Sequence, residues 1–129
     1  MNLRIEPGDG VPIYLQIVEQ VKRAVALGGL KPEEGLPSVR QLAVELTINP
    51  NTVARAYLEL EHQGVIYKRQ GQGTFVSAQA SEASKRDRQK IVGALFEKAL
   101  IEAVNSGMAA AEIEEIYRHL IHRYKLETP

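Results

Sequence analysis

Residues 38–57 read SVRQLAVELTINPNTVARAY and contain two helix starts separated by a short turn. Ser38 can cap the first helix, and Gln41 can return a hydrogen bond to the cap residue, as in a capping box. Asn49-Pro50 is a second start signal, because asparagine caps well and proline suits the first helical position. This stretch therefore predicts two successive helices joined by a tight turn.

Each predicted helix has apolar residues on one face only, the pattern of a helix packed against a core. The first carries Val39, Leu42, Ala43 and Leu46. The second ends at Gly64 and carries Val53, Tyr57 and Leu60, so we expect Tyr57 in the core. A further helix precedes them, with Pro12 in its first turn and a stop at Gly28-Gly29; its apolar residues recur every four positions at Ile13, Ile17, Val21 and Val25.

A β-hairpin is predicted after Gly64. Residues 65–69 and 74–76 are β-prone, and they flank the glycine-containing tip at residues 70–73. The order of three helices followed by a hairpin is that of a winged helix-turn-helix domain, in which the second helix of the pair protrudes and can enter a major groove. The predicted fold class is mainly α with a small β-hairpin, followed by a C-terminal helical hairpin.

The C-terminal part of the chain is expected to be a helical dimerisation tail. Residues 77–88 are polar and read as a linker or as the solvated start of a helix. We therefore divide the chain into a DNA-binding domain at residues 1–77 and a tail at residues 78–129. Two helices in the tail have wide apolar stripes that they cannot bury on each other, so they need the winged domain or a second copy of the chain to pack against, and a second copy is the expected partner. The dimerisation residues predicted in these stripes are Ile91, Leu95, Phe96, Ala99, Ile113, Tyr117, Leu120 and Tyr124.

Composition excludes several classes of protein. The 129 residues contain no cysteine, so disulfides and thiolate chemistry are absent, and a reducing compartment, the cytoplasm, is expected. We expect no membrane segment and no signal peptide. Sixteen basic residues balance sixteen acidic ones, which argues mildly against nucleic acid. Neither a nucleophile motif nor a paired set of carboxylates is visible, so the chain is not expected to be an enzyme and no cofactor is predicted.

Polar residues at three places are candidates for contact with duplex DNA. Asparagine can pair with adenine and arginine with guanine through two hydrogen bonds each, whereas a cation near a helix start can hold a phosphate. In the wing, a glycine lets the backbone approach DNA closely. We expect Glu45, Glu59 and Glu61 to lie away from the DNA. The candidate residues are Ser38, Arg40, Asn49, Asn51, Thr52, Arg55, Lys68, Arg69, Gln70 and Gly71.

Other interpretations of these residues exist. A winged-helix domain can be a protein-interaction adaptor that does not bind DNA. Arg55 can pair with Glu59 one helical turn later, and the wing glycines can serve the turn alone. His119 and His122, with Glu115 one turn earlier, could bind a metal, but no further ligand is spaced to complete the site, and none is predicted. The tail stripes could hold an apolar effector, although packing is the commoner use of such stripes.

Five segments together resemble the GntR family of bacterial regulators. They are residues 30–32 (LKP), 36–43 (LPSVRQLA), 51–57 (NTVARAY), 60–66 (LEHQGVI) and 70–76 (QGQGTFV). The short helical tail, in place of a large effector-binding domain, is similar to that of the YtrA subfamily. This resemblance implies a winged helix-turn-helix repressor that binds a palindromic operator as a homodimer, often at an operon for an ABC-type transporter that includes the regulator's own gene.

The same resemblance implies which residues contact DNA. The family's contacts fall on Arg40, Asn49, Asn51 and Thr52, together with the wing residues Gln70 and Gly71. The chain departs from its relatives at two positions. Ala54 stands where many have arginine, with Arg55 one place later, and Pro50 stands where an arginine or polar residue is common. The departures concern the base sequence of the operator, whereas the expected docking of the helix in the groove is unchanged.

Overall fold

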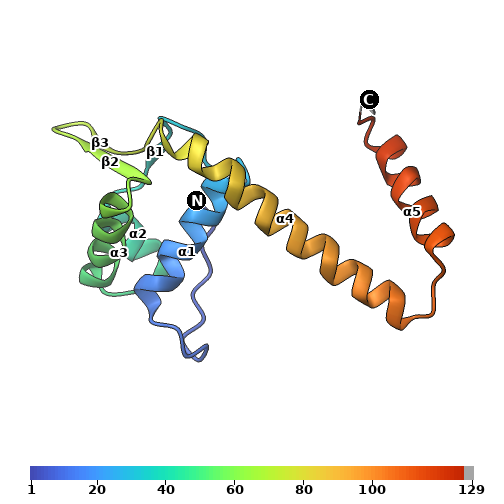
Figure 1. Ribbon diagram of the computed structural model, residues 1–129. Helices are drawn as coiled ribbons and strands as arrows, with labels where there is room; N and C mark the ends of the chain where they lie inside the picture. The colour runs from blue at the N-terminus through green and yellow to red at the C-terminus, as the bar shows by residue number, and fades with distance from the viewer. Residues whose placement is uncertain (127–129) are drawn as a thin grey trace. The chain divides into compact units, whose positions relative to one another are not determined.

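The computed structural model describes residues 1–126, without the side chains of residues 81–85. The chain divides into two compact units, Met1–Gln89 and a second that begins at Lys90. The first contains three helices and a small sheet, and the second contains helix α5 and most of helix α4 (Figure 1). In chain order the elements are α1 (Ile13–Ala26), β1 (Gly35–Leu36), α2 (Val39–Leu46), α3 (Pro50–His62), β2 (Ile66–Arg69), β3 (Gly73–Val76), α4 (Ala80–Asn105) and α5 (Ala110–Arg123).

Three helices enclose the core of the first unit, as the apolar spacing predicts. Helix α3 packs against both α1 and α2. Its predicted inner face is buried, and Val53 and Leu60 have no exposed surface. Strands β2 and β3 close the core with Ile66 and Val76. The predicted mainly helical fold with a small β-hairpin is confirmed.

Both predicted helix caps in the pair α2–α3 are present. The Ser38 hydroxyl accepts from the Gln41 amide at 3.1 Å, and the Gln41 side chain accepts from the Ser38 amide at 3.0 Å. The Asn49 Oδ1 accepts from the Asn51 amide at 2.9 Å, and Pro50 occupies the first turn of α3. In α1, by contrast, Pro12 is the cap residue and lies one position before the first helical residue.

Tyr57 lies in the core, as predicted, and also carries a hydrogen bond. Its side chain is 2% exposed, and its hydroxyl donates to the Pro37 carbonyl oxygen at 2.6 Å. That bond joins α3 to the loop that leads into α2, and it satisfies a polar group that burial would otherwise make costly. Burial, and secondarily the negative charge of Glu45, raise the pKa of Tyr57 above its ordinary value.

The raised pKa of Tyr57 predicts a loss of stability in alkali. The unfolded chain ionises this residue near pH 10, whereas the folded chain keeps it protonated, so its contribution to stability is complete below about pH 10 and is lost as the pH rises further. The free energy of unfolding should therefore fall more steeply above pH 10 in the parent than in Tyr57→Phe, by up to about 1.4 kcal/mol per pH unit. Urea unfolding at a series of pH values measures both slopes, and parallel curves would contradict the assignment.

The sheet has three strands, one more than the predicted hairpin. Strand β1 pairs antiparallel with β3 in the order β1-β3-β2, with Gly35 opposite Phe75 and Leu36 opposite Thr74. Sequence reasoning predicted only the two strands of the hairpin and missed β1. Two backbone hydrogen bonds just before β1 also hold the strand in place. The Glu33 amide donates to the Val76 carbonyl oxygen, and the Val76 amide donates to the Glu34 carbonyl oxygen.

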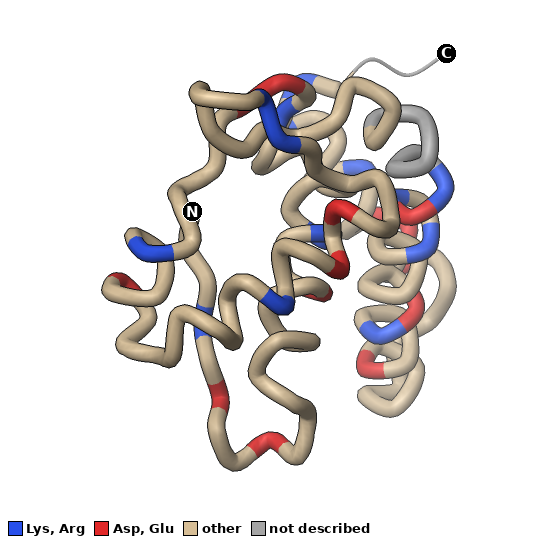
Figure 2. The backbone as a smooth tube through the Cα atoms, turned by 90° about the vertical axis from the view of Figure 1, so that its left-hand side faces the viewer, with Lys and Arg blue, Asp and Glu red and all other residues tan. Residues whose placement is uncertain are grey.

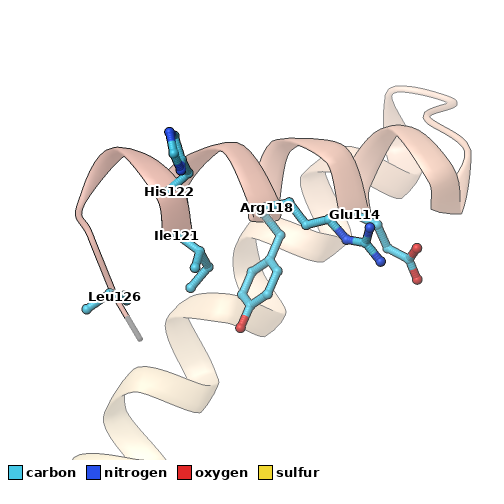
Figure 3. A pocket seen from close by; sticks show the side chains of 6 residues that line it. Glu114, Arg118, Ile121, His122 and Leu126 are labelled. Atoms are coloured by element: carbon cyan, nitrogen blue, oxygen red, sulfur yellow. The ribbon is translucent and has the colours of Figure 1, made fainter. Parts of the chain in front are cut away.

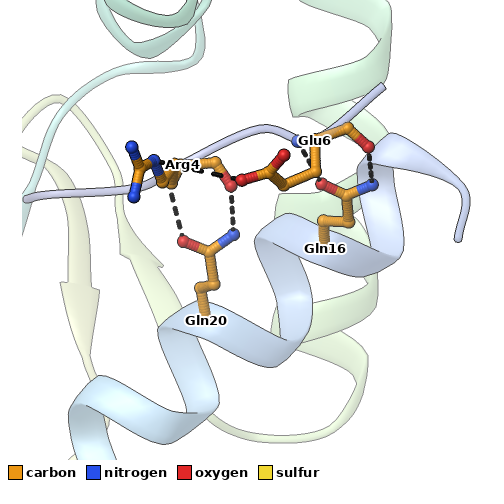
Figure 4. A network of polar contacts seen from close by, with 4 residues as sticks. All are labelled: Arg4, Glu6, Gln16 and Gln20. Carbon is orange, nitrogen blue, oxygen red and sulfur yellow. Dashed lines mark hydrogen bonds and ion pairs between the residues drawn. The ribbon is translucent and has the colours of Figure 1, made fainter. Parts of the chain in front are cut away.

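Two glutamines of α1 bind the backbone of the N-terminal segment (Figure 4). The Gln20 side chain accepts from the Arg4 amide at 2.8 Å and donates to the Arg4 carbonyl at 2.7 Å. Gln16 makes the same pair of bonds with Glu6, at 2.8 and 2.9 Å. Gln16 and Gln20 are four residues apart, which is a rise of about 6 Å along the helix. This distance matches the length of about 6.6 Å that two residues of extended chain span between Arg4 and Glu6. This pairing holds the segment along α1, where two of its residues pack against the core: Leu3 and Ile5.

Helix α4 begins within the polar stretch that followed the wing. Of the two interpretations of residues 77–88, a linker or a helix start, the second holds from Ala80 onward. Ala80 is buried, and the Arg88 Nε donates to the Ala26 carbonyl at 3.1 Å at the C-terminal end of α1. Since α4 continues without a break into the second unit, the domain division at residues 77 and 78 stays a prediction.

The second unit contains the end of α4, a turn at residues 106–109 and helix α5. Gly107 in the turn has a φ of 80°, which glycine adopts without strain. The Ala109 amide donates to the Glu112 side chain at 3.2 Å, and this bond satisfies one free amide at the start of α5. No helix in the described residues is long and apolar enough to span a bilayer.

Candidate nucleic-acid interface

The outward face of α3 carries most of the predicted recognition residues. Asn51 and Arg55 are exposed, and so are Leu58 and His62, which continue the same stripe at helical spacing on the side opposite the buried residues. Thr52 is half-buried on the flank of the helix. The structure therefore presents Asn51 and Arg55 to solvent together and gives Thr52 a more restricted position.

The two helix caps keep hydrogen-bond donors available for DNA. Ser38 caps α2 with its oxygen, which leaves the hydroxyl hydrogen to donate. Asn49 caps α3 with Oδ1, which leaves both hydrogens of its side-chain amide. Phosphate oxygens only accept hydrogen bonds, so both exposed cap residues suit a phosphate contact, Ser38 at the start of α2 and Asn49 at the turn between the helices.

Arg55 contacts an aromatic ring of α1. Its guanidinium carbon lies 3.8 Å from the centre of the Tyr14 ring, a cation–π contact. The alternative partner Glu59 instead accepts a hydrogen bond from Gln63 at 2.8 Å, and no ion pair joins Arg55 to Glu59 in the described residues. Sequence reasoning missed Tyr14, because the two residues lie on different helices. The contact fixes the direction of Arg55 and leaves its hydrogen-bond donors without a carboxylate partner.

Arg40 lies in the first turn of α2 and is exposed. Among the side chains that the structure describes, no carboxylate lies within ion-pair distance of its guanidinium. It therefore offers a full positive charge beside Ser38, near the amides at the start of the helix. This is the environment in which a phosphate is bound most favourably.

The predicted wing residue Arg69 belongs to a cluster of four side chains, which we call the wing cluster: Glu33, Tyr67, Arg69 and Phe75. The Arg69 Nη2 donates to Glu33 Oε2 at 2.6 Å and to the Tyr67 oxygen at 2.6 Å, and its Nε donates to the same oxygen at 3.0 Å. The Tyr67 hydroxyl donates to Glu33 Oε2. The guanidinium also lies 4.3 Å from the centre of the Phe75 ring. Arg69 is therefore held in one orientation from three sides.

The wing cluster explains a shifted pKa. The hydrogen bond to Glu33 is the largest cause that raises the pKa of Tyr67, because it favours the protonated phenol. Tyr67 therefore stays a donor at neutral pH. Sequence reasoning identified Arg69 but missed Glu33, Tyr67 and Phe75 as its partners. Part of the cluster could be predicted from the alternation of residues in a hairpin. The pairing of the two strands places Tyr67 opposite Phe75 and Arg69 opposite Gly73.

The second wing cation, Lys68, also has an acidic neighbour. Its Nζ lies 3.9 Å from Glu61 Oε2 at the end of α3. Glu61 therefore lies beside one of the candidate DNA contacts, because α3 ends near the start of β2; the expectation that it lies away from the DNA stays a prediction. At the tip of the wing, Gln70 is exposed, and Gly71 and Gly73 have φ angles of 77° and 114°. The turn alone thus accounts for both glycines.

Basic and acidic residues are mixed over the described residues. Figure 2 shows blue and red positions interspersed along the same helices. The balance of basic and acidic residues in the whole chain is therefore also found along its individual helices. Of the four cations between residues 40 and 73, Lys68 and Arg69 pair with carboxylates, whereas Arg40 and Arg55 do not in the described residues.

The tail helices expose the apolar side chains predicted to form a dimer. The Phe96 and Tyr117 rings contact each other edge to face, 6.4 Å between centres, yet they are 58% and 52% exposed. A hollow along α5 is lined by Glu114, Tyr117, Arg118, Ile121, His122 and Leu126 (Figure 3). Ile91 and Ile113 are half-buried, and the other predicted dimerisation residues are exposed: Leu95, Ala99, Leu120 and Tyr124. Among the described side chains, no group of three or more metal-ligating residues is arranged around a common point.

A three-helix domain with a capped, outward-facing third helix and a wing is a winged helix-turn-helix DNA-binding domain. Residues 13–76 match the family described as "Bacterial regulatory proteins, gntR family". The chain is 35% identical to the HTH-type transcriptional repressor YtrA of Bacillus subtilis over 113 residues, which are 88% of this chain and 87% of YtrA. The chain belongs to the GntR family, as its motifs indicate, and its tail is of the YtrA type.

Solved structures agree with this assignment. A transcriptional regulator from Oenococcus oeni is 36% identical and superposes with a TM-score of 0.64 over 94% of this chain and 97% of that one. AraR(DBD) in complex with operator ORX1 is 25% identical, with a TM-score of 0.52 over 60% of this chain and 96% of that one. The chain is therefore a DNA-binding transcriptional regulator and not an enzyme.

Proposed function

We propose that the protein is a homodimeric repressor that binds a palindromic operator in the bacterial cytoplasm. The observation that supports this most is the pairing of an exposed recognition face on α3 with an apolar tail that a single chain leaves uncovered. Two copies related by a twofold axis would place two α3 helices in successive major grooves, roughly 34 Å apart. Occupation of the operator would then block transcription.

In this proposal the candidate residues divide into two groups. Asn51 and Arg55 read base edges in the major groove, and Thr52 contacts the groove wall from the flank of α3. The phosphate contacts come from the turn, from α2 and from the wing, and they set the register without reading sequence. These residues are Ser38, Arg40, Asn49, Lys68, Arg69, Gln70 and Gly71.

The genes under control are proposed from the resemblance of the chain to the YtrA subfamily. We propose an operon that encodes a transporter and includes the regulator's own gene. Repression by occupancy fits this proposal, because a dimer of two winged domains bound at a promoter would exclude RNA polymerase from it.

Selection of bound sequences from random duplex DNA tests the function directly. A palindrome with half-sites about one helical turn apart is the expected result. Binding to the selected duplex should weaken with salt by roughly 0.9 log units per log unit of salt for each phosphate contacted. Recovery of no common sequence, with binding that hardly depends on salt, would refute an operator-binding function.

Replacement of Arg55 tests its assignment to a base. Arg55→Ala should weaken binding to the selected operator by about 1–3 kcal/mol and relax preference at one base pair in each half-site, because a bidentate arginine–guanine contact is lost. Titration of a panel of operator duplexes, each changed at one pair, measures both effects. Tyr14→Leu, which removes only the ring beneath Arg55, should keep the base preference. If Arg55→Ala changes thermal stability but no base preference, Arg55 serves only the contact with Tyr14.

A further inference from the structure

Glu33 combines an unfavourable backbone with several side-chain contacts. Its φ is 69°, in the left-handed region that glycine adopts freely and that other residues seldom occupy. No glycine stands there; instead a carboxylate reaches the wing from a loop that lies 36 residues before Arg69. Residues held in such a conformation persist where the surroundings fix them, and the wing cluster supplies those contacts.

The hydrogen bonds of Arg69 leave one edge of the guanidinium available. A guanidinium has five N–H donors. The bonds to Tyr67 and Glu33 use the donors of Nε and Nη2, and among the described side chains and backbone groups none accepts from Nη1. The side chains of Arg69 and Glu33 remain 41% and 46% exposed. DNA can therefore reach the Nη1 edge while Glu33 keeps its bond.

We propose that Glu33 is the internal counter-anion of the wing: it cancels the charge of Arg69 and orients Nη1 outward, so that the wing binds DNA through hydrogen bonds with little gain from charge. Glu61 Oε2 lies 3.9 Å from Lys68 Nζ and likewise neutralises part of the charge of this second wing cation. This inference rests on the proposed DNA-binding function of the wing. It also explains how a chain with zero net charge can bind a polyanion, because Arg40 and Arg55 supply the uncompensated charge.

A pair of variants with equal change in net charge tests the proposal in the full-length protein. Glu33→Gln keeps an oxygen that accepts from Arg69 and Tyr67 but removes the charge. Glu34→Gln removes one charge from the neighbouring residue, whose side chain accepts from the Lys31 amide and pairs with no wing cation in the described residues. Binding to a duplex of mixed sequence is measured for each variant over a range of KCl concentrations.

Glu33→Gln should steepen the dependence of log affinity on log salt by about 0.9, the value for one further neutralised phosphate, and strengthen binding roughly fivefold at 0.15 M salt. Glu34→Gln should keep the parental slope. In an Arg69→Gln background the two variants should have the same salt dependence, since Arg69 no longer supplies a positive charge that Glu33 can neutralise. Equal slopes for Glu33→Gln and Glu34→Gln, or a difference that persists without Arg69, would overturn the proposal. Absence of salt-dependent DNA binding by the parent would instead refute the proposed function.

Discussion

Phe96→Glu should convert the protein to a monomer and weaken operator binding by about 10²-fold or more. Phe96 lies on the exposed apolar face of α4, where the proposed second copy packs. A buried carboxylate without a partner is costly, so the dimer would not form. Two linked recognition helices gain roughly 10²–10⁴ in affinity over one, and the monomer loses this gain. Sedimentation equilibrium and operator titration measure the two effects on the same sample.

A matched variant on the same helix is the control for Phe96→Glu. Lys98→Gln changes the net charge by the same amount and lies two residues away, on a different side of α4. It should remain dimeric and bind the operator as the parent does, within the modest change expected from one surface charge. If Phe96→Glu still sediments as a dimer with parental affinity, the tail is not the dimerisation surface.

Helix α3 and its cap could be predicted because their signals are local. Asn49-Pro50 and the spacing of Val53, Tyr57 and Leu60 lie within a few residues of one another, and the structure confirms both. Strand β1 could not be predicted in this way. It has two residues, it follows a glutamate in a left-handed conformation, and its only ladder is with β3, about 40 residues later in the chain. The start of α4 was ambiguous because residues 80–88 lack apolar periodicity.

The candidate site shows the same division between local and distant signals. Residue type and position identified Asn51, Arg55 and Arg69 as polar groups at the start of α3 and on the wing. What each guanidinium touches depends on tertiary packing: Arg55 meets Tyr14 of α1, and Arg69 meets Glu33 of an earlier loop. A glutamate at a positive φ has no sequence signal, because glycine and asparagine are the residues usually associated with that conformation.

Leu60→Ala should destabilise the DNA-binding unit by about 2–5 kcal/mol, because it removes a fully buried side chain and leaves a cavity between α3 and its neighbours. That is a large part of the roughly 5–15 kcal/mol by which a domain of this kind is stable, so DNA binding should fail at a lower temperature. Urea unfolding, followed by circular dichroism, measures the free energy. Leu58→Ala is the matched control: the same change two residues earlier on the same helix, at a side chain that is 66% exposed, should alter stability by no more than about 0.5 kcal/mol. Equal losses for the two leucines would mean that the inner and outer faces of α3 are wrongly assigned, and with them the face proposed to read DNA.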